Sequence, residues 1–568
     1  MLSSYRYPKF DYIQPPEQQR GEVRRHPVVV VGAGPVGLAT AIDLAQSGVP
    51  VVLLDEDDTV SLGSRGVCYA KRTLEVLDRL GIGNPCLAKG VSWNVGRTFF
   101  QEDEVYNFNL LPQLDHKRPG MINLQQYYLE EFAVSRAGEL PNLDLRFKSK
   151  VVAVQADGQG ATLQVETPDG IYSLQADWLV VADGARSPIR RMMKLDIEGR
   201  VFKDRFLIAD VVMKADFPHE RWFWFDPPFH PGQSVLLHRQ ADHVYRIDFQ
   251  LGWQADPEEE KKPEKVIPRI RAMLGDDRPF ELEWVSVYTF QCRRMEKFRH
   301  GHVLFVGDAA HQVSPFGARG GNSGIQDADN LAWKLRLVIA GQAPEALLDS
   351  YCSERVFAAD ENIMNSTRST DFITPKSPAS LMFRDAVLAL ARDHAFARTL
   401  VNSGRLSMPS CLSNSPLNTP DTSAFNRSMR PGAAMDDAPM KEEGGDFWLL
   451  DRVGNRFMAL VHVSDPTAVD TEWLQHVKAL ASTCPALDVV LVSARPARPG
   501  RAPGGLRTFE DHAGRFAERY DSQPGTVYLI RPDQHVAARF REFDADQIKA
   551  ALARATCTAN QTAMETPA

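Results

Sequence analysis

The segment that decides the fold is HPVVVVGAGPVGLATAIDLAQSGVPVVLLDEDD, residues 26–58. The apolar run at 28–31 predicts a strand, and a helix is expected over 38–47. Between them lies a G-x-G-x-x-G turn formed by Gly32, Gly34 and Gly37. A second apolar strand, 51–54, ends at Asp55, 18 residues after the last of these glycines. This order predicts a β-α-β unit that binds a dinucleotide, with its pyrophosphate at the helix N-terminus and a ribose at the acid. The turn alone leaves NAD and FAD both open.

Composition narrows the class of protein. The chain has 568 residues, of which 43% are hydrophobic and 24% charged, and a net charge of −8. These values are typical of a globular protein with several domains and argue against nucleic acid or an anionic membrane as its partner. The seven cysteines contain no C-x-x-C pair, so neither a disulfide framework nor a metal site is predicted. With no signal peptide and no run of ~18 apolar residues, we expect a cytoplasmic protein.

Periodicity and turn residues divide the chain into six predicted segments. A polar N-terminal arm comes first, followed by the first part of a Rossmann-type α/β domain. A mainly antiparallel β-sheet domain is inserted there, and the second part of the Rossmann-type domain follows with long helices. A linker rich in Ser, Pro, Asn and Gly then leads to a small C-terminal α/β domain. These segments are, in order, residues 1–26, 27–199, 200–300, 301–403, 404–445 and 446–568.

Two further strand-end motifs narrow the choice of cofactor. ADWLVVADGARSPIRR places Asp183 and a glycine after an apolar strand, and VLFVGDAAH places a glycine and Asp308 after another. SRGVCYAKRTLEVLDRLGI supplies Arg65. With the first turn, these segments resemble, over roughly residues 25–400, the single-component FAD-dependent aromatic hydroxylases of the p-hydroxybenzoate hydroxylase fold. Within that family, the chain is most similar to 3-(3-hydroxyphenyl)propionate hydroxylases and related phenol hydroxylases.

The resemblance implies an FAD-dependent monooxygenase that hydroxylates a phenolic or aromatic-acid substrate. Such an enzyme uses NADH or NADPH and O₂ and acts through a flavin C4a-hydroperoxide. Its partners are a small aromatic substrate and O₂, without nucleic acid or a membrane. A phenol reacts best as the phenolate, so a base near the ring hydroxyl is expected, although no residue stands out as that base in the sequence.

The resemblance also implies which residues contact FAD. They are Gly32, Gly34, Pro35, Val36, Gly37, Asp55, Glu56, Arg65, Gln126, Asp183, Asp308, Pro315, Gly320, Gly321 and Asn322. Asp308 would accept hydrogen bonds from the ribityl chain, and Asp183 would lie near the pyrophosphate. Gln125 fits the pattern as well as its neighbour Gln126.

The loop at 315–324 is expected to pass the flavin ring so closely that side chains would clash. This expectation accounts for its glycines, Gly317, Gly320, Gly321 and Gly324. The helix that follows would direct its N-terminal N–H groups at the ring. Arg319 departs from the family pattern, and its direction, toward solvent or toward the ring, stays open.

The β-sheet domain is expected to form the floor of the substrate pocket. In SVLLHRQADHVYRIDFQLGW, a hairpin places Leu237 and Arg239 on one face, with Ile247 on the partner strand. These residues, together with Phe316 of the flavin loop, are the predicted substrate contacts. Arg239 lies where some relatives hold a substrate carboxylate, but a surface or ion-paired arginine is an equal alternative.

Residues 446–557 resemble the thioredoxin-like extension of phenol hydroxylase relatives. Without a C-x-x-C motif, packing or homodimer formation is favoured there over dithiol chemistry. Other functions stay open: a different FAD enzyme of this fold, such as an epoxidase, an oxidase or a halogenase, a non-catalytic FAD-binding protein, or an NAD-dependent dehydrogenase. The chain lacks the W-x-W-x-I-P segment of the halogenases, and a dehydrogenase would leave the Asp-Gly and Gly-Asp motifs unexplained.

Overall fold

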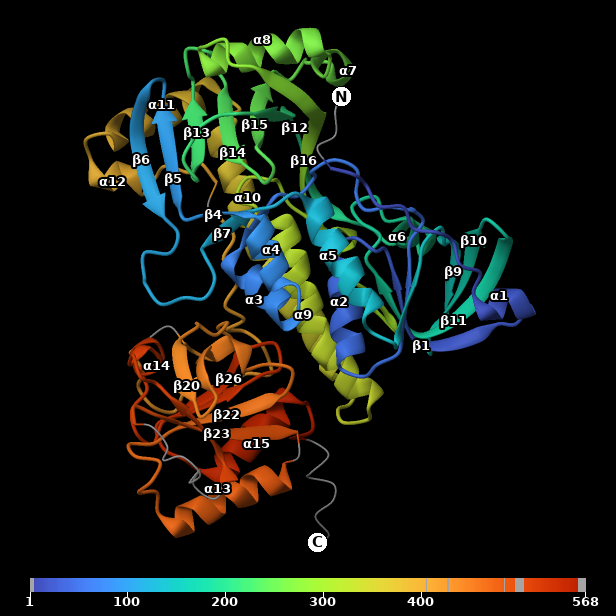
Figure 1. Cartoon of the computed structure of the whole chain (residues 1–568), viewed down its shortest axis with the longest axis vertical. Helices are drawn as coiled ribbons and strands as arrows, with labels where there is room; N and C mark the ends of the chain where they lie inside the picture. The colour runs from blue at the N-terminus through green and yellow to red at the C-terminus, as the bar shows by residue number, and fades with distance from the viewer. Residues whose placement is uncertain (1–4, 405, 427–428, 485, 496–504, 560–568) are drawn as a thin grey trace. The chain divides into compact units, whose positions relative to one another are not determined.

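The computed structural model divides the chain into two compact units (Figure 1). It describes residues 5–404, 406–426, 429–484, 486–495 and 505–559. Unit 1 comprises 1–112, 119–328 and 359–408, and unit 2 comprises 113–118, 329–358 and 409–568. The unit boundaries fall inside two helices, α9 (Gly320–Ile339) and α10 (Leu347–Ile373). The six-segment division stays a prediction, and the ends of its first and last segments, 1–4 and 560–568, lie outside the described residues.

A mainly parallel sheet carries the predicted β-α-β unit of unit 1. Its order is β17-β18-β11-β1-β2-β8, with a β9–β10 hairpin on β11. The strands are β1 (Arg24–Val31), β2 (Val51–Leu54), β8 (Leu143–Arg146), β9 (Lys150–Ala156), β10 (Ala161–Thr167), β11 (Gly170–Val181), β17 (Arg299–His300) and β18 (Val303–Phe305). Helix α2 (Pro35–Gln46) connects β1 to β2, which pair in parallel. Because β1 is a central strand that is buried toward its carboxyl end, its sequence there is a run of valines. The predicted Rossmann-type fold is confirmed.

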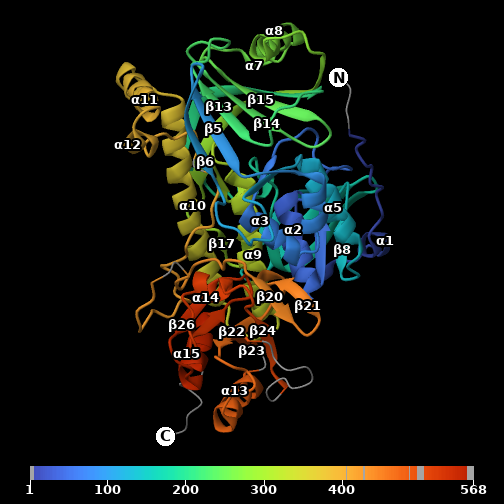
Figure 2. The ribbon, with the colours of Figure 1, turned by 60° about the vertical axis from the view of Figure 1, so that its left-hand side comes forward.

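A second, mainly antiparallel sheet is the inserted domain. Its order is β19-β16-β12-β15-β14-β13-β5-β6. The strands are β5 (Val95–Phe100), β6 (Asp103–Asn109), β12 (Glu198–Met213), β13 (Arg221–Phe225), β14 (Ser234–Arg239), β15 (Val244–Leu251), β16 (Phe280–Arg294) and β19 (His311–Gln312). Helices α7 (Pro257–Glu260) and α8 (Pro263–Leu274) cover one face, where α8 buries Val266 and Ile270 (Figures 1 and 2). The other face packs against Phe316, in the loop that precedes α9.

Smaller elements complete unit 1. A three-stranded sheet has the order β3-β7-β4, with β3 (Cys68–Ala70), β4 (Val91–Trp93) and β7 (Met121–Asn123). The helices are α1 (Pro16–Arg20), α3 (Lys71–Arg79), α4 (Gly83–Lys89), α5 (Gln126–Gly138), α6 (Pro188–Met192), α11 (Pro378–Ala391) and α12 (Ala395–Arg398), and Gly307–Ala309 forms the short turn η1. Tyr5 stacks on Tyr127 of α5, and Phe10 stacks on Phe147. These contacts hold the N-terminal segment to the sheet layer.

Unit 2 contains a third sheet with the order β21-β20-β24-β23-β22-β25-β26. The strands are β20 (Pro439–Glu442), β21 (Gly445–Trp448), β22 (Phe457–His462), β23 (Leu487–Ser493), β24 (Arg507–Glu510), β25 (Val527–Ile530) and β26 (Val536–Phe540). Helices α13 (Thr471–Thr483), α14 (Arg515–Arg519) and α15 (Ala545–Ala555) and the short turn η2 (Leu449–Asp451) accompany it. The C-terminal α/β domain is confirmed, and strand β20 lies within the segment predicted as a linker. Among the described residues, no helix is long and apolar enough to cross a membrane.

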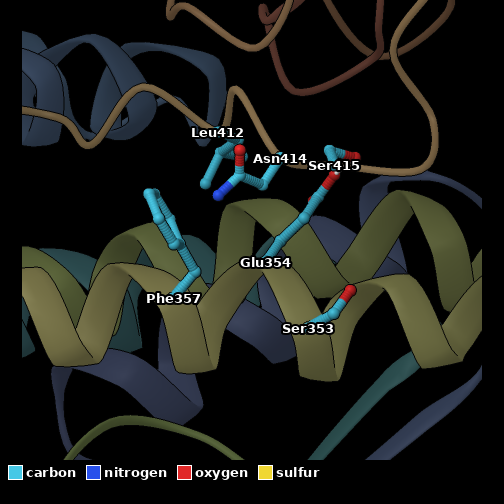
Figure 3. A pocket seen from close by; sticks show the side chains of 6 residues that line it. All are labelled: Ser353, Glu354, Phe357, Leu412, Asn414 and Ser415. Atoms are coloured by element: carbon cyan, nitrogen blue, oxygen red, sulfur yellow. Dashed lines mark hydrogen bonds between the residues drawn. The ribbon is translucent and has the colours of Figure 1, made fainter.

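Unit 2 also buries a group of charged side chains. Glu354 accepts hydrogen bonds from Lys334 Nζ at 2.7 Å and from Arg531 Nη1 at 2.7 Å, and Arg531 pairs with Asp533 as well. Figure 3 shows Glu354 at the wall of a cavity of about 20 Å³. The cavity is lined by Ser353, Glu354, Phe357, Leu412, Asn414 and Ser415. That volume holds about one water molecule, so this cavity is too small for a flavin or an aromatic ring.

Candidate functional site

The four predicted cofactor motifs lie along one edge of the mainly parallel sheet. Strands β18, β11, β1 and β2 are neighbours and run parallel, so their carboxyl ends share this edge. The glycine turn follows β1, Asp55 follows β2, Asp183 follows β11 and Asp308 follows β18. Open α/β sheets bind ligands outside the carboxyl ends of their strands. This edge is therefore the candidate cofactor site.

The structure explains the three glycines of the first turn in different ways. Gly32 has a φ of +104°, and a Cβ there would lie 2.4 Å from the carbonyl oxygen of Ala182. A Cβ at Gly37 would lie 1.8 Å from the carbonyl oxygen of Gly32, so the packing of the turn requires both glycines. Gly34, the N-cap of α2, has an ordinary φ of −73° and nothing within 4 Å of an added Cβ. This open space beside the helix N-terminus suits a pyrophosphate.

Asp183 presents a carboxylate oxygen that lacks a partner. Its Oδ2 accepts a hydrogen bond from Ile189 N at 3.0 Å, whereas Oδ1 is buried and has no partner among the described residues. Burial raises the pKa of this carboxyl group. The adjacent Gly184 has a φ of +78° and open space around it. Because a buried acceptor without a donor is costly, a ligand hydroxyl or amide group is the expected partner.

The side chain of Asp308 is reached by solvent, although much of its surroundings is protein. The residue is exposed, yet desolvation by the surrounding protein raises the pKa of its carboxyl group. Both features are expected of an acid that lines a cavity. Tyr288 of β16 lies within electrostatic range of Asp308 and of Arg65, and burial raises its pKa to about 12. Gly320 at the start of α9 is also close, since a Cβ there would lie 3.9 Å from Asp308 Oδ1.

Arg190 and Gln312 tie together the loops that carry the two aspartates. Arg190 donates to the carbonyl oxygens of Ala309 at 2.6 Å and Ala185 at 3.1 Å. Gln312 donates to Ala185 O at 2.7 Å and to Asp308 O at 3.2 Å. These two side chains were not among the predicted site residues. Arg190 lies in the quoted Asp-Gly segment, but its direction depends on contacts that the sequence does not reveal.

Two predicted cofactor contacts use their side chains within the protein. Asp55 accepts hydrogen bonds from the backbone N–H groups of Ala33 and Asp57 and so clamps the glycine turn onto β2. Gln126 accepts from Gly66 N at 3.0 Å and donates to Ser61 and Glu130. Asp55 keeps further lone pairs for a ribose.

Gln125 was the alternative to Gln126, and its side chain has different partners. Its Nε2 donates to the carbonyl oxygen of Ala241 at 3.1 Å, and its buried Oε1 has no partner among the described residues. Of the two neighbours, Gln125 is therefore the one with free hydrogen-bonding capacity. Glu56, another predicted contact, is exposed and pairs with Lys150 at 3.1 Å.

The loop before α9 differs in part from the prediction. A Cβ at Gly324 would lie 2.5 Å from Val36 Cγ2, and one at Gly307 would lie 3.1 Å from the same atom. Gly324 thus makes room for Val36 of α2, not for a flavin ring. A Cβ at Gly321 would meet nothing within 4 Å, and one at Gly320 would make only ordinary contacts with Val313 and Asp308 at 3.7 and 3.9 Å.

Asn322 and Arg319 both stabilise this loop. The Asn322 Oδ1 accepts from Ala70 N at 2.8 Å and from Thr73 Oγ1 at 2.6 Å, which joins α9 to β3 and α3. Arg319 is buried, and its Nη1 donates to Asn362 Oδ1 of α10 at 2.7 Å. This contact excludes the solvent-facing alternative for Arg319, because its guanidinium group is buried in the protein.

The four predicted substrate residues lie on two faces of the inserted sheet: Leu237, Arg239 and Ile247 share one face, as expected, and Phe316 packs on the other. Leu237 and Ile247 are buried in the core under α8. Arg239 is half-buried, with its guanidinium group 5.9 Å from the ring centroid of Tyr245. Phe316, 4% exposed, packs on the opposite face of the sheet. A shift of one residue along a strand moves a side chain to the other face, and only the packed structure shows which face meets the loop before α9.

The face that meets Phe316 carries polar side chains that the sequence prediction missed. Arg221, His238, Arg246 and Asp210 are cross-strand partners in one row over β13, β14, β15 and β12. Asp248 lies two residues beyond Arg246 on the same face. A signal was present in VYRIDFQL, where polar residues at 246, 248 and 250 alternate with apolar ones.

The whole chain was compared with known proteins and protein families. Residues 25–366, more than half of the chain, match the family model described as FAD binding domain. The chain belongs to this FAD-binding family. Residues 440–555 match the HcaD C-terminal domain.

Individual members of the FAD-binding family cover most of the chain. A protein of Klebsiella pneumoniae (strain 342) named 3-(3-hydroxy-phenyl)propionate/3-hydroxycinnamic acid hydroxylase is 28% identical, over 93% of both chains. Para-nitrophenol 4-monooxygenase of Pseudomonas sp. (strain WBC-3) is 29% identical, over 58% of this chain and 82% of its own length. The crystal structure of the flavin-dependent monooxygenase PieE with FAD and substrate superposes with a TM-score of 0.78. It is 22% identical and covers 94% of this chain and 99% of its own, which establishes the fold.

The candidate site of this FAD-binding protein fits the cofactor. The open space at Gly34 and the N-terminus of α2 suit a pyrophosphate. The buried free oxygen of Asp183 and the carboxylate of Asp308 suit hydroxyl or amide donors. The exposed Arg65 suits an anionic or carbonyl group.

Proposed function

We propose that this protein is an FAD-dependent monooxygenase that hydroxylates a phenolic or aromatic-acid substrate with NAD(P)H and O₂. The observation that carries the proposal is the single sheet edge where the glycine turn, Asp55, Asp183 and Asp308 lie side by side. The names of the two relatives, a 3-(3-hydroxy-phenyl)propionate/3-hydroxycinnamic acid hydroxylase and a para-nitrophenol 4-monooxygenase, support an aromatic substrate. Bound FAD would supply the electron transfer and oxygen activation.

In this proposal, the chain's residues bind and orient. Gly34 and the N-terminus of α2 hold the pyrophosphate, Asp55 holds a ribose, and Asp183 takes a hydrogen bond from the dinucleotide. Asp308 accepts from the ribityl chain, and Arg65 lies beside the ring system. Gly320, Gly321 and Pro315 form the surface nearest the ring. The remaining proposed contacts are Gly32, Pro35, Val36, Gly37, Glu56, Gln126 and Asn322.

The substrate is proposed to bind between the loop before α9 and the sheet face that carries His238 and Asp248. Apolar side chains there exclude water, which protects a reactive oxygen species from wasteful decay. The corresponding proposals for the whole molecule are a cytoplasmic location, the six-segment division, and a homodimer. Sedimentation of the FAD-loaded protein tests the last.

The test is NADH and NADPH oxidation by the FAD-loaded protein in the presence of phenols and phenolic acids. A compound that accelerates oxidation and yields a product heavier by one oxygen atom supports the proposal and names the substrate class. Acceleration that ends only in H₂O₂, measured with catalase controls, identifies a non-substrate effector. If every compound leaves oxidation unchanged although FAD is bound, the hydroxylase proposal fails.

A further inference from the structure

The inserted sheet places an acid on the face that meets the loop before α9. Asp248 on β15 is the cross-strand partner of Leu236 on β14 and Ile208 on β12, so all three share that face. Leu236 packs in the cluster that contains Phe316. On β16, Tyr288 shares this face through its partner Phe206, and Tyr288 is the residue within electrostatic range of Asp308. Asp248 therefore faces the same side of the sheet as the residues nearest the proposed flavin site.

Asp248 is half-buried, and its Oδ1 is fully buried without a hydrogen-bond partner among the described residues. Two neighbours on the same face share this condition. Arg221 Nη1 and His238 Nδ1 are also buried and lack partners in the described part of the chain. Three polar atoms on adjacent strands thus have no hydrogen-bond partner in the part of the chain that the structure describes. A ligand with polar groups at more than one position would satisfy them.

This polar group adjoins the loop that follows the Gly-Asp motif. Arg221 Nη2 donates to Ser403 O at 2.7 Å. A Cβ at Gly404 would lie 3.5 Å from Arg221 Nη2 and 3.1 Å from Gly317 N. Arg221 and the loop therefore meet at one glycine. A substrate that contacts Arg221 and Asp248 would lie against the loop proposed to pass the flavin.

The charged and titratable groups around Asp248 come from five strands. Arg246 lies on its own strand, Asp210 on β12, Arg221 on β13, His238 on β14 and Cys68 on β3. Arg246 is already neutralised, because it pairs with Asp210 at 2.9 Å and donates to Ser64 Oγ at 2.7 Å.

Burial is the main influence on the pKa values of Asp248, His238 and Cys68. It raises the pKa of Asp248 to about 7, although Arg246 and Arg221 act to lower it. It also lowers the pKa of His238 well below its usual value and raises that of Cys68 to about 12, so both are neutral at pH 7. A carboxylate that titrates near the working pH is suited to proton transfer.

We propose that Asp248 is the base that takes the proton from the ring hydroxyl of a phenolic substrate, with Arg221 and His238 binding the polar substituents of that substrate. The hydroxyl O–H bond breaks, its electron pair stays on the phenolate oxygen, and a new O–H bond forms on the Asp248 carboxylate. The proton returns to solvent after the product leaves. This assignment rests on the proposed hydroxylase function and adds the residue that activates the ring.

The experiment compares Asp248→Asn with Asp216→Asn, the same chemical change at an exposed position of the same domain. The first readout is substrate binding without turnover, followed by flavin fluorescence from about pH 5 to about pH 9. In the unaltered protein and the control, an un-ionised phenol should bind about tenfold more tightly above pH 7, because the ionised carboxylate accepts a charge-assisted hydrogen bond. In Asp248→Asn the affinity should not change with pH. A residue with only a structural role would shift the affinity equally at every pH.

The second readout compares two phenols during turnover. For a phenol that is un-ionised at neutral pH, the hydroxylation rate of Asp248→Asn should be at least about 100-fold lower than that of the control. For a nitrophenol that is already ionised in solution, it should stay within about threefold of the control, since no proton needs to be removed. Equal slowing of both phenols, or a pH-dependent affinity that persists in Asp248→Asn, would overturn the assignment.

Two outcomes separate this inference from the proposed function. If the unaltered protein hydroxylates no phenol, the hydroxylase proposal fails, and the assignment of Asp248 as the base fails with it. If the unaltered protein hydroxylates un-ionised phenols with an affinity and rate that are flat through pH 7, only the Asp248 assignment fails. The pH dependence of the unaltered protein is measured without any variant. It therefore tests the Asp248 assignment even where Asp248→Asn does not fold.

Discussion

Asp183 offers a buried carboxylate oxygen at the sheet edge that has no hydrogen-bond partner among the described residues, and Asp308 at the same edge is exposed. At the scale of single residues, this lack of a partner marks Asp183 as a candidate for a ligand contact. Asp327, by contrast, accepts from His311 Nε2 at 2.6 Å and from Gly307 N at 2.9 Å, and so holds the Gly-Asp turn. Asp327 lies on α9 and not at the end of a strand, and its carboxylate is used to hold the turn.

We predict that Asp308→Asn weakens FAD binding by about 10- to 100-fold, because a charge-assisted hydrogen bond contributes about 1.5–3 kcal/mol. Flavin fluorescence during titration of the apoprotein measures this loss. Asp216→Asn, which changes an exposed acid of the same unit, should bind FAD normally. Unchanged affinity in Asp308→Asn would remove this residue from the proposed site.

The glycine turn gives a second residue-scale prediction. Gly37→Ala places a Cβ 1.8 Å from a backbone oxygen, so it should lower the free energy of unfolding by more than about 2 kcal/mol. Gly34→Ala has room and an ordinary φ, so it should fold normally but bind FAD more weakly. Urea unfolding and flavin titration distinguish the two effects. If Gly34→Ala binds FAD as tightly as the unaltered chain, the pyrophosphate does not approach that position.

At the scale of elements, α1 and the sheet are joined by a buried carboxylate. Glu17 of α1 accepts from Arg146 Nη1 of β8 at 2.6 Å and lies 3.2 Å from His26 Nε2 of β1. Burial alone would raise its pKa, but the hydrogen bonds from His26 and Arg146 lower it to about 2. Glu17 thus joins the short helix to β1 and β8, and its neighbour Gln18 joins it to Thr167 and Gly170 of the next hairpin.

We predict that Glu17→Gln destabilises unit 1 by up to about 3 kcal/mol at pH 7, because the pKa of Glu17 in the folded protein, about 2, lies well below its ordinary value. Since the folded pKa lies below the ordinary value, the contribution is present above about pH 4.5 and is lost as the pH falls toward about 2. Urea unfolding at pH 7 and near pH 3 should show the two proteins converging. A difference that stays constant with pH would contradict the carboxylate's role.

At the scale of the whole molecule, unit 2 is built from segments that are far apart in the sequence. Lys334, Glu354, Arg531 and Asp533 meet in its interior, although 177 residues separate Glu354 from Arg531. Around them, the core joins residues of α9 and α10 to the C-terminal sheet. The pairing of the four charges is what allows them to be buried.

Removing one member of this buried charge group should therefore lower the free energy of unfolding. Glu354→Gln leaves Lys334 and Arg531 with less counter-charge, and we expect a loss of about 3–5 kcal/mol in the free energy of unfolding. The control is Glu442→Gln, which breaks an exposed pair with Arg507 and should cost no more than about 1 kcal/mol. Thermal unfolding of the two variants tests the contrast. Equal losses would mean that the buried pairing contributes no more than a surface pair.

Local patterns in the sequence were sufficient for the cofactor half of the molecule. The valines of β1, the spacing of the glycines and the acids at strand ends are properties of short segments, and parallel strands bring their carboxyl ends to one edge automatically. The family assignment, the Rossmann-type fold and the inserted antiparallel sheet were predictable for the same reason.

Which face of the inserted sheet meets the loop before α9 was decided only by tertiary structure. Leu237 and His238 are neighbours in sequence but lie on opposite faces of β14, and alternation alone does not say which face meets the flavin domain. The partners of Gln126, Asn322 and Arg319 likewise lie on segments brought in by folding. Periodicity and spacing determine which side chains share a surface, whereas only long-range packing determines what that surface faces.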